Sequence, residues 1–149
     1  MQPNTKLDKA ENGKDVDETP YRGMIGSLMY LTSSRPDIIQ SVDVCSRFQS
    51  HSKESHLSAV KWIIRYIKGT SDFDLWYPKT DEFCIVGYCE ADFVGDRMNR
   101  RSTSGICCFL GQSLNVWSSK KQATVDLSTT EAKYISASSC CSQLIWLKI

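Results

Sequence analysis

The fold of this chain is decided by residues 87–93, which read GYCEADF, and by residues 127–132, which read LSTTEA. The first run has the aromatic and apolar content of a short strand, and it carries Glu90 and Asp92 two positions apart. The second run begins a helix, because Ser128 and Glu131 fit the S-x-x-E pattern of a helix N-terminus. Proteins bind divalent cations with carboxylates, so the junction of this strand and this helix is where we expect chemistry.

Bulk composition excludes few classes of function. The formal net charge is +1 at pH 7, so any contact with a polyanion depends on local patches rather than on overall attraction. No apolar run is long enough to cross a bilayer, and no signal peptide precedes the chain. We therefore expect an intracellular protein of the cytoplasm or nucleus, without membrane association.

The cysteines form an odd set without the C-x-x-C spacing of a zinc or redox site. Most lie within apolar strand or helix patterns, so we interpret them as small buried hydrophobic residues. They are Cys45, Cys84, Cys89, Cys107, Cys108, Cys140 and Cys141.

The first half of the chain is predicted to be helical after a polar start. Residues 1–19 have too few large apolar groups to offset the entropy of ordering, so we expect a disordered lead-in. Thr19 and Pro20 suit the cap and first turn of a helix that ends near residue 32. A second helix is expected from Pro36, and a third over residues 57–67 with Gly69 at its end.

Beyond Thr70 the periodicity changes to that of strands. Short aromatic and β-branched runs at 73–77, 83–89, 105–110 and 114–119 are separated by turn-forming stretches. They indicate an antiparallel meander, followed by a last helix from Ser128 to Lys148. The predicted class is therefore α+β, with a helical segment over 20–70 and a sheet over 71–149.

Six runs in order resemble the C-terminal end of a copia-type retrotransposon Pol polyprotein, where the reverse transcriptase ends and ribonuclease H begins. They are YRGMIGSLMYL (21–31), SRPDI (34–38), RYIKGT (65–70), RSTSG (101–105), WSSKKQ (117–122) and LSTTEA (127–132). The resemblance implies that residues 20–70 are a thumb-like or connection-like segment of the reverse transcriptase. It also implies that residues 71–149 are the front part of a ribonuclease H-like mixed sheet.

The resemblance implies a two-metal nuclease in the parent protein. Ribonuclease H hydrolyses the RNA strand of RNA–DNA hybrids with magnesium ions held by carboxylates. By resemblance, Glu90 and Glu131 are the catalytic residues and metal ligands, and Asp92 is a substitute ligand. The family motif reads like G-Y-S-D-A-D-W, whereas this chain has Cys89, Glu90 and Phe93. Because the later catalytic aspartates lie beyond Ile149, we expect this truncated chain to be inactive.

Several of these residues also have structural interpretations. Glu131 could cap its helix rather than bind metal, and both roles stay open. Asp92 and Asp96 lie where the strand meets a loop over 95–101, and acidic residues are common in turns. His51 and His56 have no neighbouring ligands in the sequence, so we predict surface histidines.

Basic residues gather at three places that could follow a phosphate backbone without reading sequence. Lys61, Arg65 and Lys68 share one face of the third helix beside Trp62 and Tyr66, although a merely solvated face has the same pattern. The other two groups lie in loops of the sheet. They are Arg97, Arg100 and Arg101, and then Lys120 and Lys121.

The sequence therefore leaves three functions open. The first is a fragment of a reverse transcriptase and ribonuclease H without activity of its own. The second is a non-catalytic module that binds an RNA–DNA hybrid or other nucleic acid weakly. The third is an unstable product of a decayed element, which would fail to unfold cooperatively.

Overall fold

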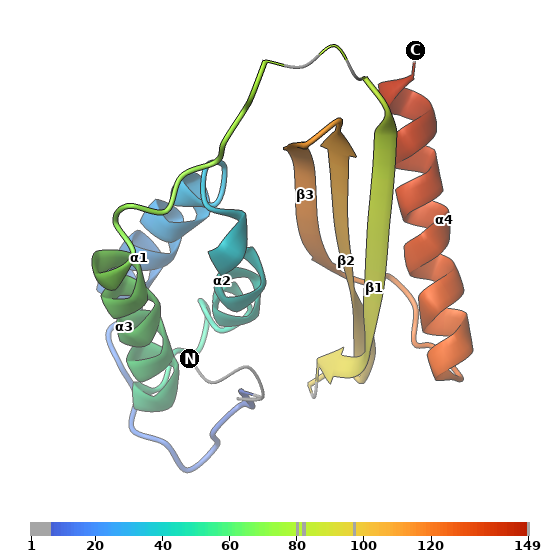
Figure 1. The fold of residues 1–149 in the computed structure, drawn as a ribbon. Coiled ribbons are helices and arrows are strands. Elements are labelled where there is room, and N and C mark those ends of the chain that lie inside the picture. Colours follow the sequence, from blue (N-terminus) through green and yellow to red (C-terminus); the bar gives the residue numbers. More distant parts are fainter. Residues whose placement is uncertain (1–6, 80, 82, 97, 149) are drawn as a thin grey trace. The chain divides into compact units, whose positions relative to one another are not determined.

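The computed structural model describes residues 7–79, 81, 83–96 and 98–148. It divides into two compact units, one up to Asp74 and one from Leu75 onward. The first unit is helical and the second is a three-stranded antiparallel sheet with one helix (Figure 1). The predicted α+β class is confirmed.

The helical unit contains α1 (Glu18–Leu31), the 3-10 helix η1 (Pro36–Ile38), α2 (Ile39–Ser46) and α3 (Glu54–Gly69). α1 begins earlier than predicted because Asp17, not Thr19, is its cap: the Asp17 carboxylate accepts the Thr19 amide at 2.9 Å. The three α-helices and η1 close around an apolar core. Its buried members are Tyr21, Ile25, Leu28, Ile38, Val42, Cys45, Ala59, Val60 and Ile63.

Residues 7–17 of the predicted 1–19 lead-in are packed against this helical unit rather than disordered, whereas residues 1–6 of that prediction lie outside the described residues. Leu7 contacts the core, and the Val16 amide donates to the Ser52 carbonyl at 3.1 Å. The Lys53 ammonium lies 2.6 Å from the Asp15 carboxylate. Backbone pairing with the start of α3 therefore orders a segment whose composition alone could not.

His56 is fully buried, so the prediction of a surface histidine is wrong for this residue, whereas His51 is exposed. The His56 ring stacks on Phe48 with centroids 3.9 Å apart. Its Nδ1 accepts the Lys53 amide at 3.1 Å, and its Nε2 lies 2.7 Å from the Asp8 carbonyl. The two contacts together specify a neutral ring with the proton on Nε2. His56 thus caps α3 and ties the lead-in to it.

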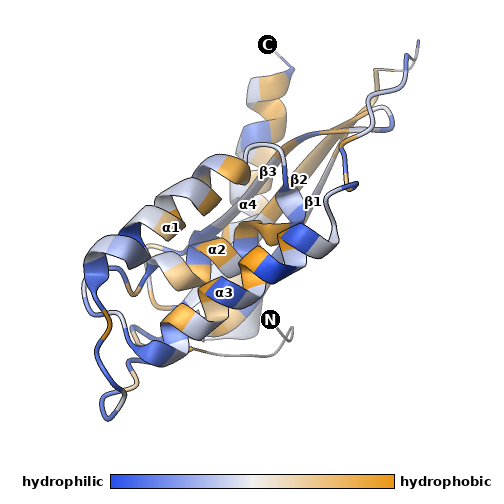
Figure 2. Ribbon diagram, turned by 90° about the vertical axis from the view of Figure 1, so that its left-hand side faces the viewer, coloured by the Kyte–Doolittle hydropathy of each residue, from blue (hydrophilic) through white to orange (hydrophobic). Residues whose placement is uncertain are grey.

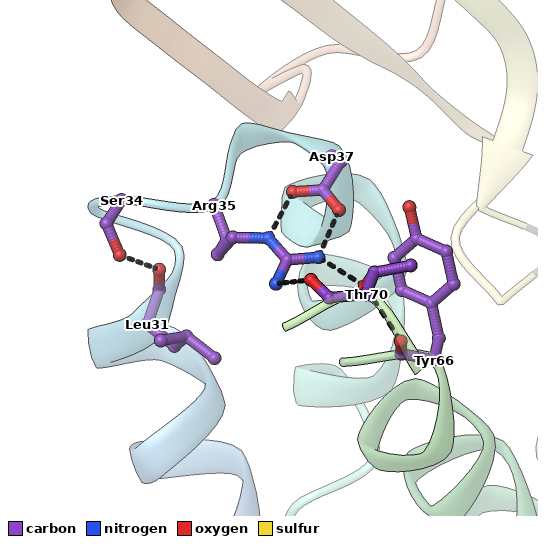
Figure 3. Close-up of polar contacts among 6 residues, drawn as sticks. All are labelled: Leu31, Ser34, Arg35, Asp37, Tyr66 and Thr70. Carbon is purple, nitrogen blue, oxygen red and sulfur yellow. Dashed lines mark hydrogen bonds and ion pairs between the residues drawn. The ribbon is translucent and has the colours of Figure 1, made fainter. Parts of the chain in front are cut away.

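Arg35 joins two of the sequence motifs across the helical unit (Figure 3). Its guanidinium donates to both oxygens of Asp37, at 2.9 and 2.7 Å. It also donates to the Thr70 carbonyl at 3.1 Å and to the Thr70 hydroxyl at 2.8 Å. Because Arg35 is buried, this fork fixes the turn before η1 to the end of α3.

The second unit contains β1 (Ile85–Asp96), β2 (Arg101–Leu110), β3 (Ser113–Lys121) and α4 (Thr129–Leu147). The sheet order is β1-β2-β3, with both pairs antiparallel as predicted. The strand predicted at 73–77 is wrong: these residues have no regular secondary structure, and Phe73, Trp76 and Tyr77 are exposed. The aromatic content resembled that of a strand, but Pro78 follows, and no strand among the described residues pairs with this segment.

α4 packs on one face of the sheet, over β1 and β2 (Figure 1). Gly87 lets the helix approach closely, because a Cβ there would lie 2.8 Å from both the Cys140 Sγ and a Leu144 methyl. Its register partner Cys108 is fully buried beneath α4. The interior of this unit is therefore the layer between α4 and the sheet.

Candidate carboxylate site and basic surface

Glu90 and Asp92 lie on regular strand backbone opposite Gly105 and Thr103 of β2. Side chains alternate between the two faces of a strand, and a Cβ at Gly87 would point at α4. Counting in twos from Gly87 places Cys89 and Ala91 on the α4 face. The two carboxylates therefore belong to the other face of the sheet, and both are exposed.

α4 runs antiparallel to β1. The Ser136 hydroxyl donates to the Glu90 carbonyl at 2.8 Å, and the Cys140 thiol lies 3.8 Å from the Tyr88 carbonyl. The N-terminus of α4 is therefore at the end of β1 that carries the acidic residues. The topology thus brings Glu131 to the same end of the sheet as Glu90, but on the opposite side of it.

Glu131 caps α4 in this structure. Its amide donates to the Ser128 hydroxyl at 3.1 Å, and its carboxylate accepts the Leu127 amide at 2.6 Å. In a standard capping box the glutamate carboxylate accepts the amide of the cap residue itself, which here is Ser128. Glu131 instead accepts the amide of Leu127, one residue earlier. This is a capping interaction of the kind that the S-x-x-E pattern suggested.

The donor set does not fit the two magnesium ions that the family implies. Among the described residues, no three His, Cys, Asp or Glu side chains lie close enough to share a metal ion. Glu90 and Glu131 project from opposite sides of the sheet, and Glu131 is bonded to its own helix start. We therefore derive no catalytic step through a metal in this chain.

Asp96 is a buried carboxylate that organises the β1–β2 turn. The Met98 amide donates to it at 3.1 Å, the Asn99 side chain at 3.0 Å, and the Lys121 ammonium lies 3.2 Å away. Burial alone would raise the pKa of Asp96, but the donors from Asn99, Lys121 and the Met98 amide outweigh it and lower the pKa. Asp96 is thus a structural turn residue.

Asp96→Asn should lower the stability of the sheet unit by about 1–2 kcal/mol at pH 7, through lost charged hydrogen bonds. Because the folded pKa of Asp96 is below the unfolded value of about 3.9, its stabilisation is present above that pH and is lost as pH falls through the folded pKa. Melting temperatures of the parent and the Asp96→Asn protein, measured by circular dichroism, should therefore converge as the pH falls below about 3.9. A gap independent of pH, or an equal gap for the exposed Asp74→Asn control, would contradict this.

The predicted basic loops are partly strand, because Arg101 begins β2 and Lys120 and Lys121 end β3, and they are only partly open to a ligand. Arg100 and Lys120 are exposed, Arg101 is half-buried, and Lys121 is paired with Asp96. Arg97 lies outside the described residues.

The basic face of α3 is open. Lys61, Arg65 and Lys68 are all exposed, and within the described ranges none of them forms an ion pair. The Arg65 guanidinium lies 5.3 Å from the centre of the Trp62 ring. Hydrophilic and hydrophobic turns alternate along this helix in Figure 2.

Two polar residues between β3 and α4 were missed by sequence reasoning. The buried Gln122 amide donates to the Ser104 hydroxyl and the Ala132 carbonyl, each at 2.9 Å, and so holds α4 to β2. The Asp126 carboxylate is also buried and has no hydrogen-bond partner among the described residues. It precedes the α4 cap by two positions, where the helix dipole favours a negative charge. Polar residues in a loop carry no sequence signal for burial.

Known proteins resemble this chain over nearly its whole length. It is 40% identical over 147 residues to the retrovirus-related Pol polyprotein from transposon RE1 of Arabidopsis thaliana, and 42% identical over 150 residues to that from transposon TNT 1-94 of Nicotiana tabacum. Each match covers 99% of this chain. The chain belongs to the copia-type retrotransposon Pol family. The predicted resemblance is confirmed, and this Pol segment derives from a transposon.

The Pol segment spans about a tenth of the length of these two relatives, 10% and 11%. It is also 38% identical to the secreted RxLR effector protein 161 of Plasmopara viticola, a match that covers 87% of this chain and 92% of that protein. No protein-family model and no solved structure matches the chain. In the part that the structure describes, no helix has both the length and the apolar character to cross a membrane.

Proposed function

We propose that this Pol segment joins the end of a reverse transcriptase to the front half of a ribonuclease H domain. In the parent polyprotein, that domain would hydrolyse the RNA strand of an RNA–DNA hybrid with two magnesium ions. The supporting observation is the order of three antiparallel strands and then a helix. With this order of elements, Glu90, Asp92 and Glu131 lie at the same end of the sheet.

The segment alone would not catalyse this reaction. Glu90 and Glu131 occupy opposite sides of the sheet, and the Glu131 carboxylate is held by the Leu127 amide. Magnesium demands near-octahedral ligands, and a misplacement of about 1 Å can cost on the order of a hundredfold in rate.

Incubation with an RNA–DNA hybrid labelled on the RNA strand tests this proposal. We expect no magnesium-dependent cleavage above that of Glu131→Gln purified in the same way. Cleavage that requires magnesium and disappears in Glu131→Gln would show that the segment is an active nuclease. It would contradict the prediction that the segment alone is inactive.

A second candidate, a non-catalytic nucleic-acid-binding module, is favoured by the α3 surface. Three exposed cations without ion-pair partners among the described residues lie beside exposed rings. Binding of a hybrid should weaken steeply with salt and be reduced by Lys61→Ala with Arg65→Ala. Binding that is insensitive to both would exclude this candidate. Failure of the whole chain to unfold cooperatively would instead favour the decayed product.

A further inference from the structure

We propose that the exposed face of α3 binds single-stranded nucleic acid, with an unpaired base stacked on Trp62. This inference rests on the nucleic-acid-binding candidate above and specifies its ligand. The surface, called here the α3 face, consists of Lys61, Trp62, Arg65, Tyr66 and Lys68.

The rings on the α3 face are large and partly exposed, and Trp62 is the more open of the two because the Arg35 guanidinium lies 5.9 Å from the centre of the Tyr66 ring. Trp62 is 55% exposed and Tyr66 42% exposed, although aromatic side chains are ordinarily among the groups a helix buries. The Arg65 guanidinium already lies 5.3 Å from the centre of the Trp62 ring, so a cation and a π-surface are paired in the folded protein. A base stacked on this ring would have its phosphate close to that cation.

Charge on the α3 face has one sign. After Glu54 in its first turn, α3 contains no acidic residue, whereas Lys61, Arg65 and Lys68 follow one another at intervals of four and three residues. At 1.5 Å per residue these cations extend over about 10 Å of the helix. They form a short positive track beside the rings, which complements a chain of phosphates rather than a protein surface of mixed charge.

The geometry favours a single strand over a duplex or a membrane. Bases within a duplex already stack on one another, so a ring on a convex helix surface can stack only with an unpaired base. A membrane would need a continuous apolar stripe, but the main apolar stripe of α3 is used internally. Its members Ala59, Val60 and Ile63 are buried in the core of the helical unit.

Fluorescence anisotropy with labelled twelve-nucleotide oligo(dT) and a twelve-base-pair RNA–DNA hybrid tests this inference on the full chain. Because base–aromatic stacking contributes about 1–3 kcal/mol, Trp62→Ala should weaken oligo(dT) binding about 5- to 150-fold and change hybrid binding little. Trp76→Ala is the matched control, since Trp76 is 80% exposed but lies outside α3. Circular dichroism should show that both variants keep the helical content of the parent.

The outcomes separate the two proposals. Salt-sensitive binding that Lys61→Ala reduces but Trp62→Ala leaves unchanged would overturn base stacking and retain the binding module. Equal loss of oligo(dT) and hybrid binding in Trp62→Ala would overturn the preference for single strands. Absence of salt-sensitive binding to either probe would overturn the binding module itself. Binding to anionic phospholipid vesicles without binding to either nucleic acid would assign the α3 face to a membrane instead.

Discussion

Arg35→Leu is expected to lower the free energy of unfolding of the helical unit by about 3 kcal/mol, near the low end of the cost of breaking a buried ion pair. The low end applies because 29% of the Asp37 side chain is exposed, whereas only 9% of the Arg35 side chain is. The change also leaves the Thr70 carbonyl and hydroxyl without their donor. Native-state hydrogen exchange of peptides from α1 to α3 measures the effect within this unit.

The matched control is Arg22→Leu, which removes an exposed ion pair with Glu18 and an exposed hydrogen bond to the Gln49 carbonyl. The Arg22 and Glu18 side chains are 54% and 39% exposed. Exposed pairs contribute about 0.2–1 kcal/mol, so exchange should change far less. Arg35→Lys should be intermediate, because lysine retains the charge but not the planar fork. Equal exchange in the Arg35→Leu and Arg22→Leu proteins would show that the fork does not stabilise the fold.

Gly87→Val should destabilise the sheet unit by about 2–3 kcal/mol, because inserting carbon atoms into a packed interior forces its neighbours to move. The first added atom alone would lie 2.8 Å from the Cys140 Sγ and a Leu144 methyl. Thermal unfolding followed by circular dichroism measures the loss. Leu144→Ala in the same chain should recover part of it, because it removes one of the two obstacles.

Gly105→Val is the control for this change. Gly105 lies in β2 of the same sheet, but no atom lies within 4 Å of a Cβ built there. Valine also suits a strand better than glycine does, so this variant should be at least as stable as the parent. If Gly87→Val and Gly105→Val unfolded alike, close approach of α4 could not be the reason for glycine at position 87.

Sequence periodicity predicted the fold where one buried face dominates. The periodicity after Pro36 predicts a buried stripe of Ile38, Ile39, Val42, Cys45 and Phe48, and all of these are buried except Ile39, which is half-buried. Local propensity gave wrong predictions where contacts with distant parts of the chain determine the structure. Residues 73–77 have strand-like composition but no partner strand among the described residues. The polar residues 7–17 are held by hydrogen bonds to Ser52 and to the start of α3.

The candidate site was predictable in its parts but not in its geometry. Helix start signals located Glu131, and the strand pattern located Glu90. Which face each carboxylate occupies depends on where α4 packs, and that follows from the close contact at Gly87. Gln122 and Asp126 were missed because a loop has no periodicity that reveals a buried polar group.

The Arg35 fork has a consequence for how such sequences change over generations. Position 35 in the SRPDI run and position 70 in the RYIKGT run are partners in one set of hydrogen bonds. A substitution at Arg35 or Thr70 is therefore expected to lower stability even in a copy that no longer transcribes or cleaves anything. The constraint on these two positions is one of folding, and it is separate from any constraint that catalysis would place on metal ligands.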